Sequence, residues 1–329
     1  MRASRAARIV SLAVSALFGC ASAADGDPTP ENAPVLPASS TEGQPPATTP
    51  SEEPDDPAPS ALTPTAKSEL VDGVLTLQTN VPARIPECNP NVACEDADGD
   101  GLVDAWESLV LERLRPRIEL DEGEEILKDA KGKIAMVGRV TPRPGSASSV
   151  MVYIILAYSR DYGSCGFTSH NGDNERVALE LSVKGSDATV RRVYTAAHEG
   201  AASDDGHVYA DKELVTELRF LEEKGEPRWV VFASRNKHAT YANVDRCNAH
   251  SMIPCLAEKC AADGVSDVEA FRVLPPIVNA GEPHRHLADD LASLGFPGET
   301  AWTTSTFCGG LGGSGCAGGN ASKLTTDPF

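Results

Sequence analysis

Five strand-like segments constrain the fold of this chain more than any other feature of its sequence. All five are rich in β-branched and aromatic residues, which favour strands. Within one of them Val177, Leu179, Leu181 and Val183 alternate with other residues, the period-two pattern of a strand with one buried face. The segments span residues 73–79, 149–158, 176–183, 189–197 and 228–234. Polar turns separate them, so the sequence predicts a mainly β fold, an antiparallel β-sandwich with a few short peripheral helices.

Helical patterns are fewer. Trp106, Leu109, Val110 and Leu114 lie at helical spacing, and Pro116 ends that segment. A second short helix is expected over residues 266–274.

The N-terminus has the features of an export signal. Three arginines precede a short apolar run over residues 9–18, which predicts a signal peptide over 1–19. Two processing alternatives remain open. The sequence before Cys20 resembles a bacterial lipobox, and Ala21-Ser22-Ala23 is typical of cleavage that yields a soluble product. Because nine cysteines is an odd number, lipidation of Cys20 is favoured. The chain is therefore expected at the bacterial cell envelope as a lipoprotein of the outer membrane, or else secreted.

The composition changes near residue 66. Residues 20–66 are rich in Pro, Ala, Thr and acidic residues and poor in large apolar ones, so they are expected to form a disordered tether. A lead-in segment (67–110) and the sandwich domain (111–329) follow. The net charge of -19 argues against nucleic acid as a partner, because phosphates would repel such a surface.

Eight cysteines remain after Cys20, and in an exported protein an even number predicts disulfides. Short spacing favours three local pairs and leaves one long-range pair. These pairs are Cys88–Cys94, Cys255–Cys260, Cys308–Cys316 and Cys165–Cys247.

The most specific motif is an EF-hand-type calcium loop over residues 96–107. Calcium takes six to eight oxygen ligands, so carboxylates at alternate positions surround it, a glycine (Gly101) permits the sharp turn and a final glutamate supplies two oxygens. The expected ligands are Asp96, Asp98, Asp100, the carbonyl of Leu102, Asp104 and Glu107. The alternative is an acidic turn without metal. No amphipathic helix precedes the loop, which indicates a structural site rather than a calcium sensor.

A second cluster of metal-ligating residue types surrounds the middle strands. Asp161, His170, Asp173 and Glu175 lie just before and within one predicted strand. Histidine and carboxylate at strand ends can hold a divalent metal or act as a general acid and base. His198 and His238 follow two other predicted strands and are the candidate catalytic residues. The alternative for each histidine is a hydrogen-bonded structural role.

Several short motifs, in this order, resemble those of the vacuolar protein sorting-associated protein 62 family. They are LERLRPRIELDEGEEI (111–126), SHNGDNERVALEL (169–181), VYTAAHEG (193–200), WVVFASRNKHATYAN (229–243) and FCGGLGG (307–313). The H-x-x-D-x-E spacing is also similar to the metal-binding heptapeptide of the necrosis- and ethylene-inducing cytolysins, which are β-sandwiches. Asn174 replaces the Trp of the family pattern, and Arg235-Asn236-Lys237 replaces its small residues.

The resemblance implies that His170, Asp173 and Glu175 line a pocket for a second divalent cation, Mg²⁺ or Ca²⁺. Asp161 is the possible fourth ligand. In the cytolysins such a metal helps to hold a sugar headgroup of a membrane lipid, so a glycan or lipid headgroup is the implied partner.

Three functions are compatible with these residues. The favoured one is an exported calcium-binding lipoprotein whose sandwich binds a glycan or lipid headgroup at the second metal, with the membrane reached through a lipid anchor. The second is a metal-dependent hydrolase that uses His198 or His238 as base. The third is a structural surface protein without a second metal. No nucleophile elbow, P-loop or dinucleotide fingerprint indicates a particular enzyme class.

Overall fold

A computed structural model describes residues 62–88, 94–163, 169–199, 204–249, 257–261, 271–281 and 323–329, apart from the side chains of His170 and Asn171. These residues belong to one compact unit, Pro57–Phe329. The predicted signal peptide, Cys20 and most of the predicted tether lie outside the described residues. Within the described ranges, no helix has the length and apolar character that a membrane-spanning segment needs.

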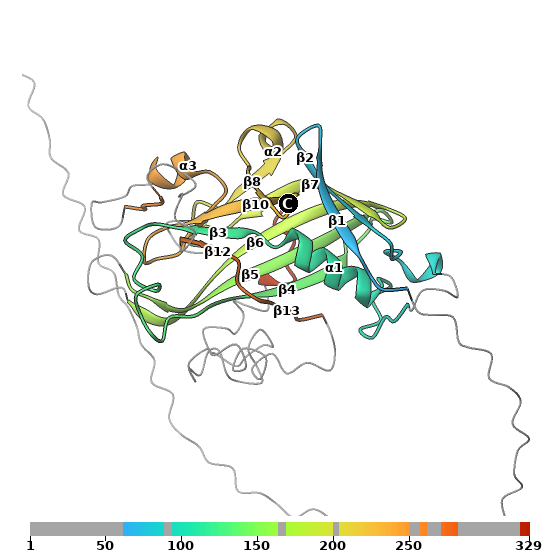
Figure 1. The fold of residues 1–329 in the computed structure, drawn as a ribbon, viewed down its shortest axis with the longest axis horizontal. Helices are drawn as coiled ribbons and strands as arrows, with labels where there is room; N and C mark the ends of the chain where they lie inside the picture. The colour runs from blue at the N-terminus through green and yellow to red at the C-terminus, as the bar shows by residue number, and fades with distance from the viewer. Residues whose placement is uncertain are drawn as a thin grey trace, which may run out of the picture. The chain divides into compact units, whose positions relative to one another are not determined.

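The fold is mainly β, as the sequence predicts, and consists of two sheets and a few short helices (Figure 1). The large sheet has the order β1-β2-β7-β6-β5-β4-β13, with β8 also paired to β7. Its strands are β1 (Ala66–Val71), β2 (Val74–Thr79), β4 (Ile134–Pro142), β5 (Ser149–Asp161), β6 (His170–Lys184), β7 (Asp187–Thr195), β8 (His207–Ala210) and β13 (Ile277–Asn279).

The small sheet has the order β11-β10-β3-β12, with β9 also paired to β10. Its strands are β3 (Arg117–Leu120), β9 (Arg219–Glu223), β10 (Glu226–Ala233), β11 (Thr240–Tyr241) and β12 (Arg272–Val273). The helical elements are η1 (Ile85–Glu87), α1 (Asp104–Leu114), α2 (Lys212–Thr216) and α3 (Val244–Ala249).

Most strand pairs are antiparallel, but β3 with β10 and β4 with β13 are parallel. Each parallel pair joins strands far apart in the chain, and only such long connections allow parallel pairing. The predicted helix over 266–274 is wrong at Arg272–Val273, which form β12, whereas Phe271 lies in a 3₁₀ turn. Val273 pairs with Ile118 of β3. Pairing with a distant strand therefore overrides the local helical pattern.

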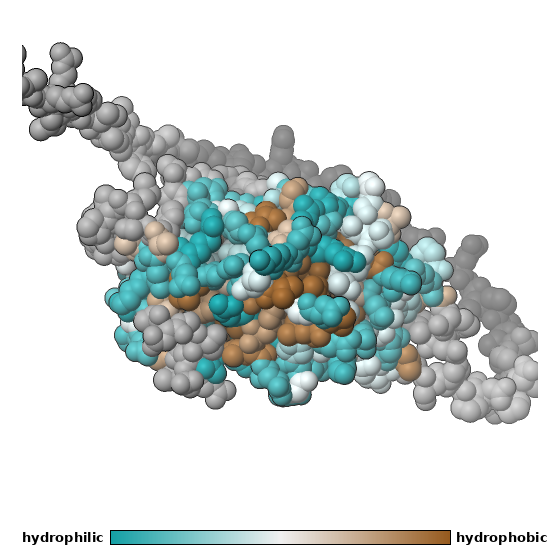
Figure 2. All heavy atoms as spheres, turned by 90° about the horizontal axis from the view of Figure 1, so that it is seen from above, coloured by the Kyte–Doolittle hydropathy of each residue, from teal (hydrophilic) through white to brown (hydrophobic). Residues whose placement is uncertain are grey.

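The main core lies where the large sheet, the small sheet and helix α1 meet. The alternating Val177, Leu179, Leu181 and Val183 of β6 all face this core, which confirms the period-two prediction. Strand β5 is buried on both faces. Its even-numbered residues from Val150 to Tyr158 join the main core, and its odd-numbered residues pack under the chain end with Leu324. Hydrophobic side chains also reach the surface, and Figure 2 shows them gathered at the centre of one face within a hydrophilic rim.

Helix α1 confirms the predicted helical segment and packs against strands of both sheets. The indole nitrogen of Trp229 on β10 donates to the carbonyl of Leu114 at the end of the helix, at 2.5 Å. On the large sheet, Gly138 of β4 lets Leu111 of the helix approach closely, because a Cβ at this position would lie 2.5 Å from Cδ2 of Leu111. Helix α1 therefore packs on both sheets, and the predicted calcium loop, which ends in the first turn of this helix, is attached to the core.

The structure shows two disulfides among the described residues. Cys88–Cys94 forms as predicted. Cys247 pairs with Cys260, so the predicted pairs Cys255–Cys260 and Cys165–Cys247 are wrong. Cys165, Cys255, Cys308 and Cys316 lie outside the described residues. Spacing in the sequence did not predict the second bridge, because Cys247 of helix α3 and Cys260 meet in a cluster with residues of β10 and β11.

Candidate functional site

The predicted calcium loop lies between the Cys88–Cys94 disulfide and helix α1. Gly99 and Gly101 have φ angles of +74° and +92°, a region in which glycine avoids the steric cost of a side chain. Leu102 and Val103 are fully buried in the main core. This geometry agrees with the sharp turn expected at Gly101. It also shows that the two apolar residues anchor the loop to the core.

Backbone amides organise the carboxylates of the loop. Asp96 accepts hydrogen bonds from the amides of Asp100 (3.1 Å) and Gly101 (3.0 Å). The carbonyl of Gly101 and the amide of Val103 bond to the segment around Arg84, with which Leu102 forms an isolated β-bridge. The amide of Leu102 instead donates to Oδ1 of Asp100 at 2.8 Å. The amide and carbonyl of an extended residue point to the same side, so the Leu102 carbonyl is on the loop side of this bridge.

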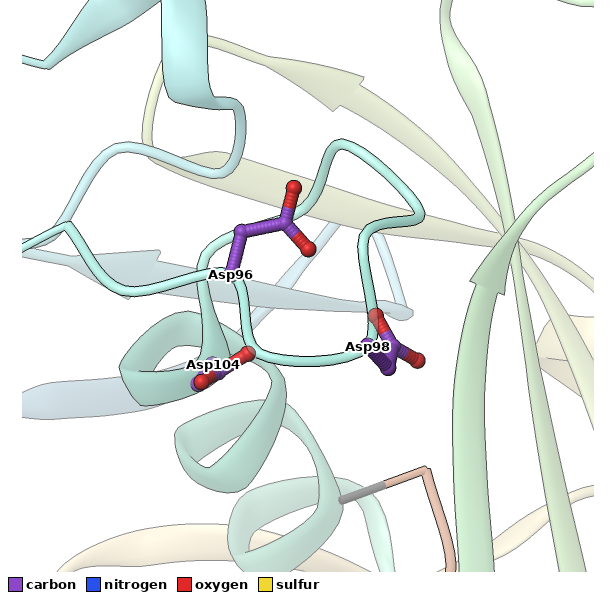
Figure 3. Close-up of side chains that lie close together, drawn as sticks. All are labelled: Asp96, Asp98 and Asp104. Atoms are coloured by element: carbon purple, nitrogen blue, oxygen red, sulfur yellow. The ribbon is translucent and has the colours of Figure 1, made fainter. Parts of the chain in front are cut away.

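Three of the predicted ligands come together. Ligand oxygens of Asp96, Asp98 and Asp104 all lie within 4.8 Å of one another. Figure 3 shows Asp96 and Asp98 on the loop and Asp104 at the start of α1. Among the described residues, this is the only group of three His, Cys, Asp or Glu side chains that meets this distance.

Glu107 is the residue whose surroundings best fit a bound cation. It is 3% exposed, and its Oε1 is buried without a hydrogen-bond partner. Burial and the carboxylates of Asp100, Asp98, Asp104 and Asp96 raise the pKa of Glu107 to about 9. Oδ2 of Asp100 is likewise buried without a partner. A hard divalent cation would neutralise these carboxylates and provide the missing partner, so the residues present fit Ca²⁺.

The second predicted metal cluster is only partly described. Asp161 ends β5 opposite His170, and Asp173 and Glu175 lie on β6. The side chain of His170 lies outside the described part of the structure. Asp173 accepts a hydrogen bond from His238, while Glu175 is buried with Oε2 unpartnered. Burial raises the pKa of Glu175 to about 8. The second metal stays a prediction.

His238 lies between two carboxylates inside the protein. It is fully buried, its Nδ1 is 2.9 Å from Asp173 and its Nε2 is 3.6 Å from Glu124. Its ring stacks on that of Tyr158, with ring centroids 3.9 Å apart. Burial alone would lower the pKa of His238, but hydrogen bonding and the charges of Asp173 and Glu124 outweigh burial and raise it to about 10. The two carboxylates therefore favour the protonated form of this buried imidazole.

His198 belongs to a second buried charge cluster. Its Nε2 is 2.8 Å from Glu258, and Nζ of Lys237 is 2.6 Å from the same Glu258 oxygen. Burial would raise the pKa of Glu258, but the hydrogen bonds from His198 and Lys237 outweigh it and lower the pKa to about 2. Sequence reasoning missed Glu124 and Glu258. Glu124 lies within the first family-like motif, whereas no pattern around Glu258 points to His198.

Three non-glycine residues near these clusters have positive φ angles: His198 (+58°), Asn236 (+64°) and His238 (+59°). Such conformations cost of order 1 kcal/mol and persist where the surroundings impose them. The surroundings of these residues include the ion pairs of His198 and His238 and, for Asn236, a hydrogen bond from its amide to Glu124.

We expect Glu258 to make the protein sensitive to acid. Its folded pKa lies below the unfolded value, so its contribution is complete above about pH 4.5 and is lost as pH falls toward 2. Between pH 5.5 and pH 3 the loss should be about 2 kcal/mol of unfolding free energy. Urea unfolding of the parent protein and of Glu258→Gln at both pH values measures it. Glu258→Gln should be less stable at pH 7 and lose less on acidification. The exposed Glu222→Gln should behave as the parent, and equal acid loss in all three proteins would contradict the assignment.

Comparisons with known proteins do not assign this chain to a family. No protein-family model matches it, and no curated protein matches it. One solved structure, described as "Toxin fold for microbial attack and plant defense", is similar at 15% identity with a TM-score of 0.32. The similarity covers 57% of this chain and 80% of that one. A likeness this weak says nothing about activity.

Proposed function

We propose that this chain is an exported calcium-binding protein in which one Ca²⁺ at residues 96–107 has a structural role. The observation that supports this most is Glu107, a buried glutamate with an unpartnered oxygen beside four other carboxylates. Buried charges are normally paired or bound to metal, and the donors here are the oxygens that calcium prefers. The two disulfides are compatible with export.

The position of the loop favours a structural ion over a sensor. Helix α1 begins at Asp104 without a side-chain cap from Val103, and its apolar residues reach into the main core. A calcium ion bound by Asp104 and Glu107 would fix the first turn of this helix, at the end that favours negative side chains. In the described residues before the loop, a short 3₁₀ turn, η1, is followed by the Cys88–Cys94 disulfide. The described residues therefore contain no entering helix next to the loop that calcium could reposition.

Glu107→Gln tests the site. The substitution keeps the shape but removes the bidentate carboxylate, so we expect calcium affinity to fall at least about 100-fold, or about 2.7 kcal/mol. Isothermal titration with Ca²⁺ of the purified, oxidised protein measures this. Glu112→Gln, on the same helix but 50% exposed, is the matched control and should bind as the parent protein does. Absence of calcium binding at millimolar concentration in the parent protein would overturn the proposal.

Three further properties of the chain are also proposed, each to be tested separately. These are lipidation of Cys20, a second divalent ion at Asp161, His170, Asp173 and Glu175, and a glycan or lipid headgroup as its ligand. For the hydrolase alternative, the geometry leaves one of the two candidate histidines as the catalytic base. His238 is fully buried between Asp173 and Glu124, so a catalytic base would have to be His198, whose side chain is 23% exposed.

A further inference from the structure

Residues 323–329 lie on the face of the large sheet that points away from the main core (Figure 1, red). Residues 326–329 form neither helix nor strand. Leu324 is the only residue of the segment that is fully buried, and it packs in a small cluster with Met151 and Ile155 of β5. Hydrogen bonds, an ion pair and a ring contact hold the rest of the segment to the sheet.

A buried arginine binds the backbone of the segment. Arg176 of β6 is 3% exposed, and its Nη1 donates to the carbonyls of Lys323 (3.1 Å) and Thr326 (2.9 Å). Nζ of Lys323 in turn donates to the backbone carbonyl and to the side-chain oxygen of Asn174, each at 2.5 Å. Contacts to main-chain groups hold a peptide in place whatever its side chains are, so specificity has to come from other contacts.

Two further arginines contact side chains of the segment. Arg143, which follows β4, donates to Oδ2 of Asp327 through Nε at 2.9 Å and Nη2 at 2.8 Å. The guanidinium of Arg192 on β7 lies over the ring of Phe329, 4.4 Å from its centre, which is a cation–π contact. One acidic and one aromatic side chain, two positions apart, are thus each recognised by an arginine.

Carboxylates outside the segment hold these arginines in place. Glu180 of β6 pairs with both Arg143 and Arg192, and Nη2 of Arg176 is 2.5 Å from Glu199. Among these pairs three positive charges face two carboxylates, and the aspartate of the segment supplies the third. The surface is therefore complementary in charge to its occupant. It is also preorganised, which reduces the ordering cost of binding.

We propose that this face of the large sheet is a peptide-binding surface, which the chain's own residues 323–329 occupy in cis. The partner that it fits is a short segment of another protein with a leucine, an acidic residue three positions later and an aromatic residue two positions after that. Such a partner would use the same arginines as the segment does. It could bind only when the segment leaves, so the segment is autoinhibitory.

The segment can leave without opening the main core. Leu324 belongs to the small cluster on the outer face of β5, whereas helix α1 and the apolar residues of the predicted calcium loop pack in the main core. Asp327 is exposed and Phe329 is half-buried. The peptide-binding surface and the proposed calcium site are therefore independent.

A synthetic peptide of the sequence KLTTDPF tests the proposal by fluorescence anisotropy. It is titrated into the full chain and into Leu324→Asp, which places a carboxylate in an apolar cluster and should free the surface. We expect Leu324→Asp to bind the peptide at least about tenfold more tightly than the parent, because the parent's own segment competes at high effective concentration. The peptide KLTTKPF, in which the charge facing Arg143 is reversed, should bind at least about tenfold more weakly than KLTTDPF.

Urea unfolding checks that Leu324→Asp is folded. The double variant Asp327→Lys plus Phe329→Ala leaves Leu324 in place and is the second receptor. Absence of binding of KLTTDPF to both receptors at millimolar concentration would overturn the proposal, and the segment would then be only a part of the fold. A dimer of the parent protein that KLTTDPF dissociates would show exchange of the segment between two copies, which would overturn a foreign partner.

A matched pair of variants locates the surface. In the Leu324→Asp background, Arg192→Gln removes the cation–π contact and should weaken peptide binding severalfold. Arg191→Gln makes the same change at its exposed neighbour on β7 and should have no effect. Equal binding by the two variants would contradict the assignment. Glu107→Gln in this background should bind the peptide unchanged, so failure of the calcium proposal and failure of this one are distinguishable.

Discussion

Replacing His238 by alanine should destabilise the protein by about 3–5 kcal/mol at pH 7. The substitution removes the positive charge that pairs with both Asp173 and Glu124, and it leaves Glu124 buried without its counter-ion. It also removes the ring that stacks on Tyr158. Urea denaturation followed by tryptophan fluorescence gives the change in unfolding free energy.

Two further variants separate the charge effect from the loss of packing. The double variant Glu124→Gln plus His238→Ala should recover part of the stability, because it removes the carboxylate that His238→Ala leaves unpaired. His207→Ala removes a histidine whose side chain is 29% exposed and should cost less than about 1 kcal/mol. Equal, small effects of His207→Ala and His238→Ala would contradict a buried imidazolium.

The pH dependence gives an independent check on His238. Because its folded pKa of about 10 lies above the unfolded value of 6.5, its contribution is complete below about pH 6.5 and is lost as pH rises toward 10. The parent protein should therefore lose stability between pH 7 and pH 10, and His238→Ala should lose less over the same range.

Removing calcium should lower the melting temperature by about 5–10 °C. A loop that binds with a Kd near 10 µM, within the range of such loops, contributes about 2.7 kcal/mol at 1 mM Ca²⁺. For a domain of this size, each kcal/mol shifts the melting temperature by about 2–4 °C. Scanning calorimetry with calcium and with a chelator measures the shift.

The loss of stability should also be local. Hydrogen exchange should increase most in the first turn of α1, where Asp104 and Glu107 would hold the ion, and less in β5 and β6 at the centre of the large sheet. In Glu107→Gln the chelator should change the melting temperature by less than about 2 °C. A melting temperature of the parent protein that the chelator does not change would show that this loop has no structural ion.

Local patterns in the chain predicted much of the fold. The alternation in 176–183 and the apolar runs at 149–158 and 228–234 appear as β6, β5 and β10, because burial on one or both faces of a strand leaves a direct trace in residue order. The helix that ends before Pro116 was predictable for a similar reason, since a proline and a helical apolar spacing are local features. Arg272 and Val273 were misjudged as helical because their strand partner, β3, is more than 150 residues away.

The predicted calcium loop and the buried cluster around His238 also differ in how far the sequence alone predicts them. Residue order alone predicted the calcium loop, because the proposed ligands lie within twelve consecutive residues and their spacing matches a calcium coordination shell. Only the tertiary structure decided that Glu107 is buried, that His238 lies between Glu124 and Asp173, and that Cys247 pairs with Cys260. Burial and ion pairing between distant segments depend on which strands pair and how the sheets pack. Those choices are made by the energy of the whole core, and no short stretch of sequence records them.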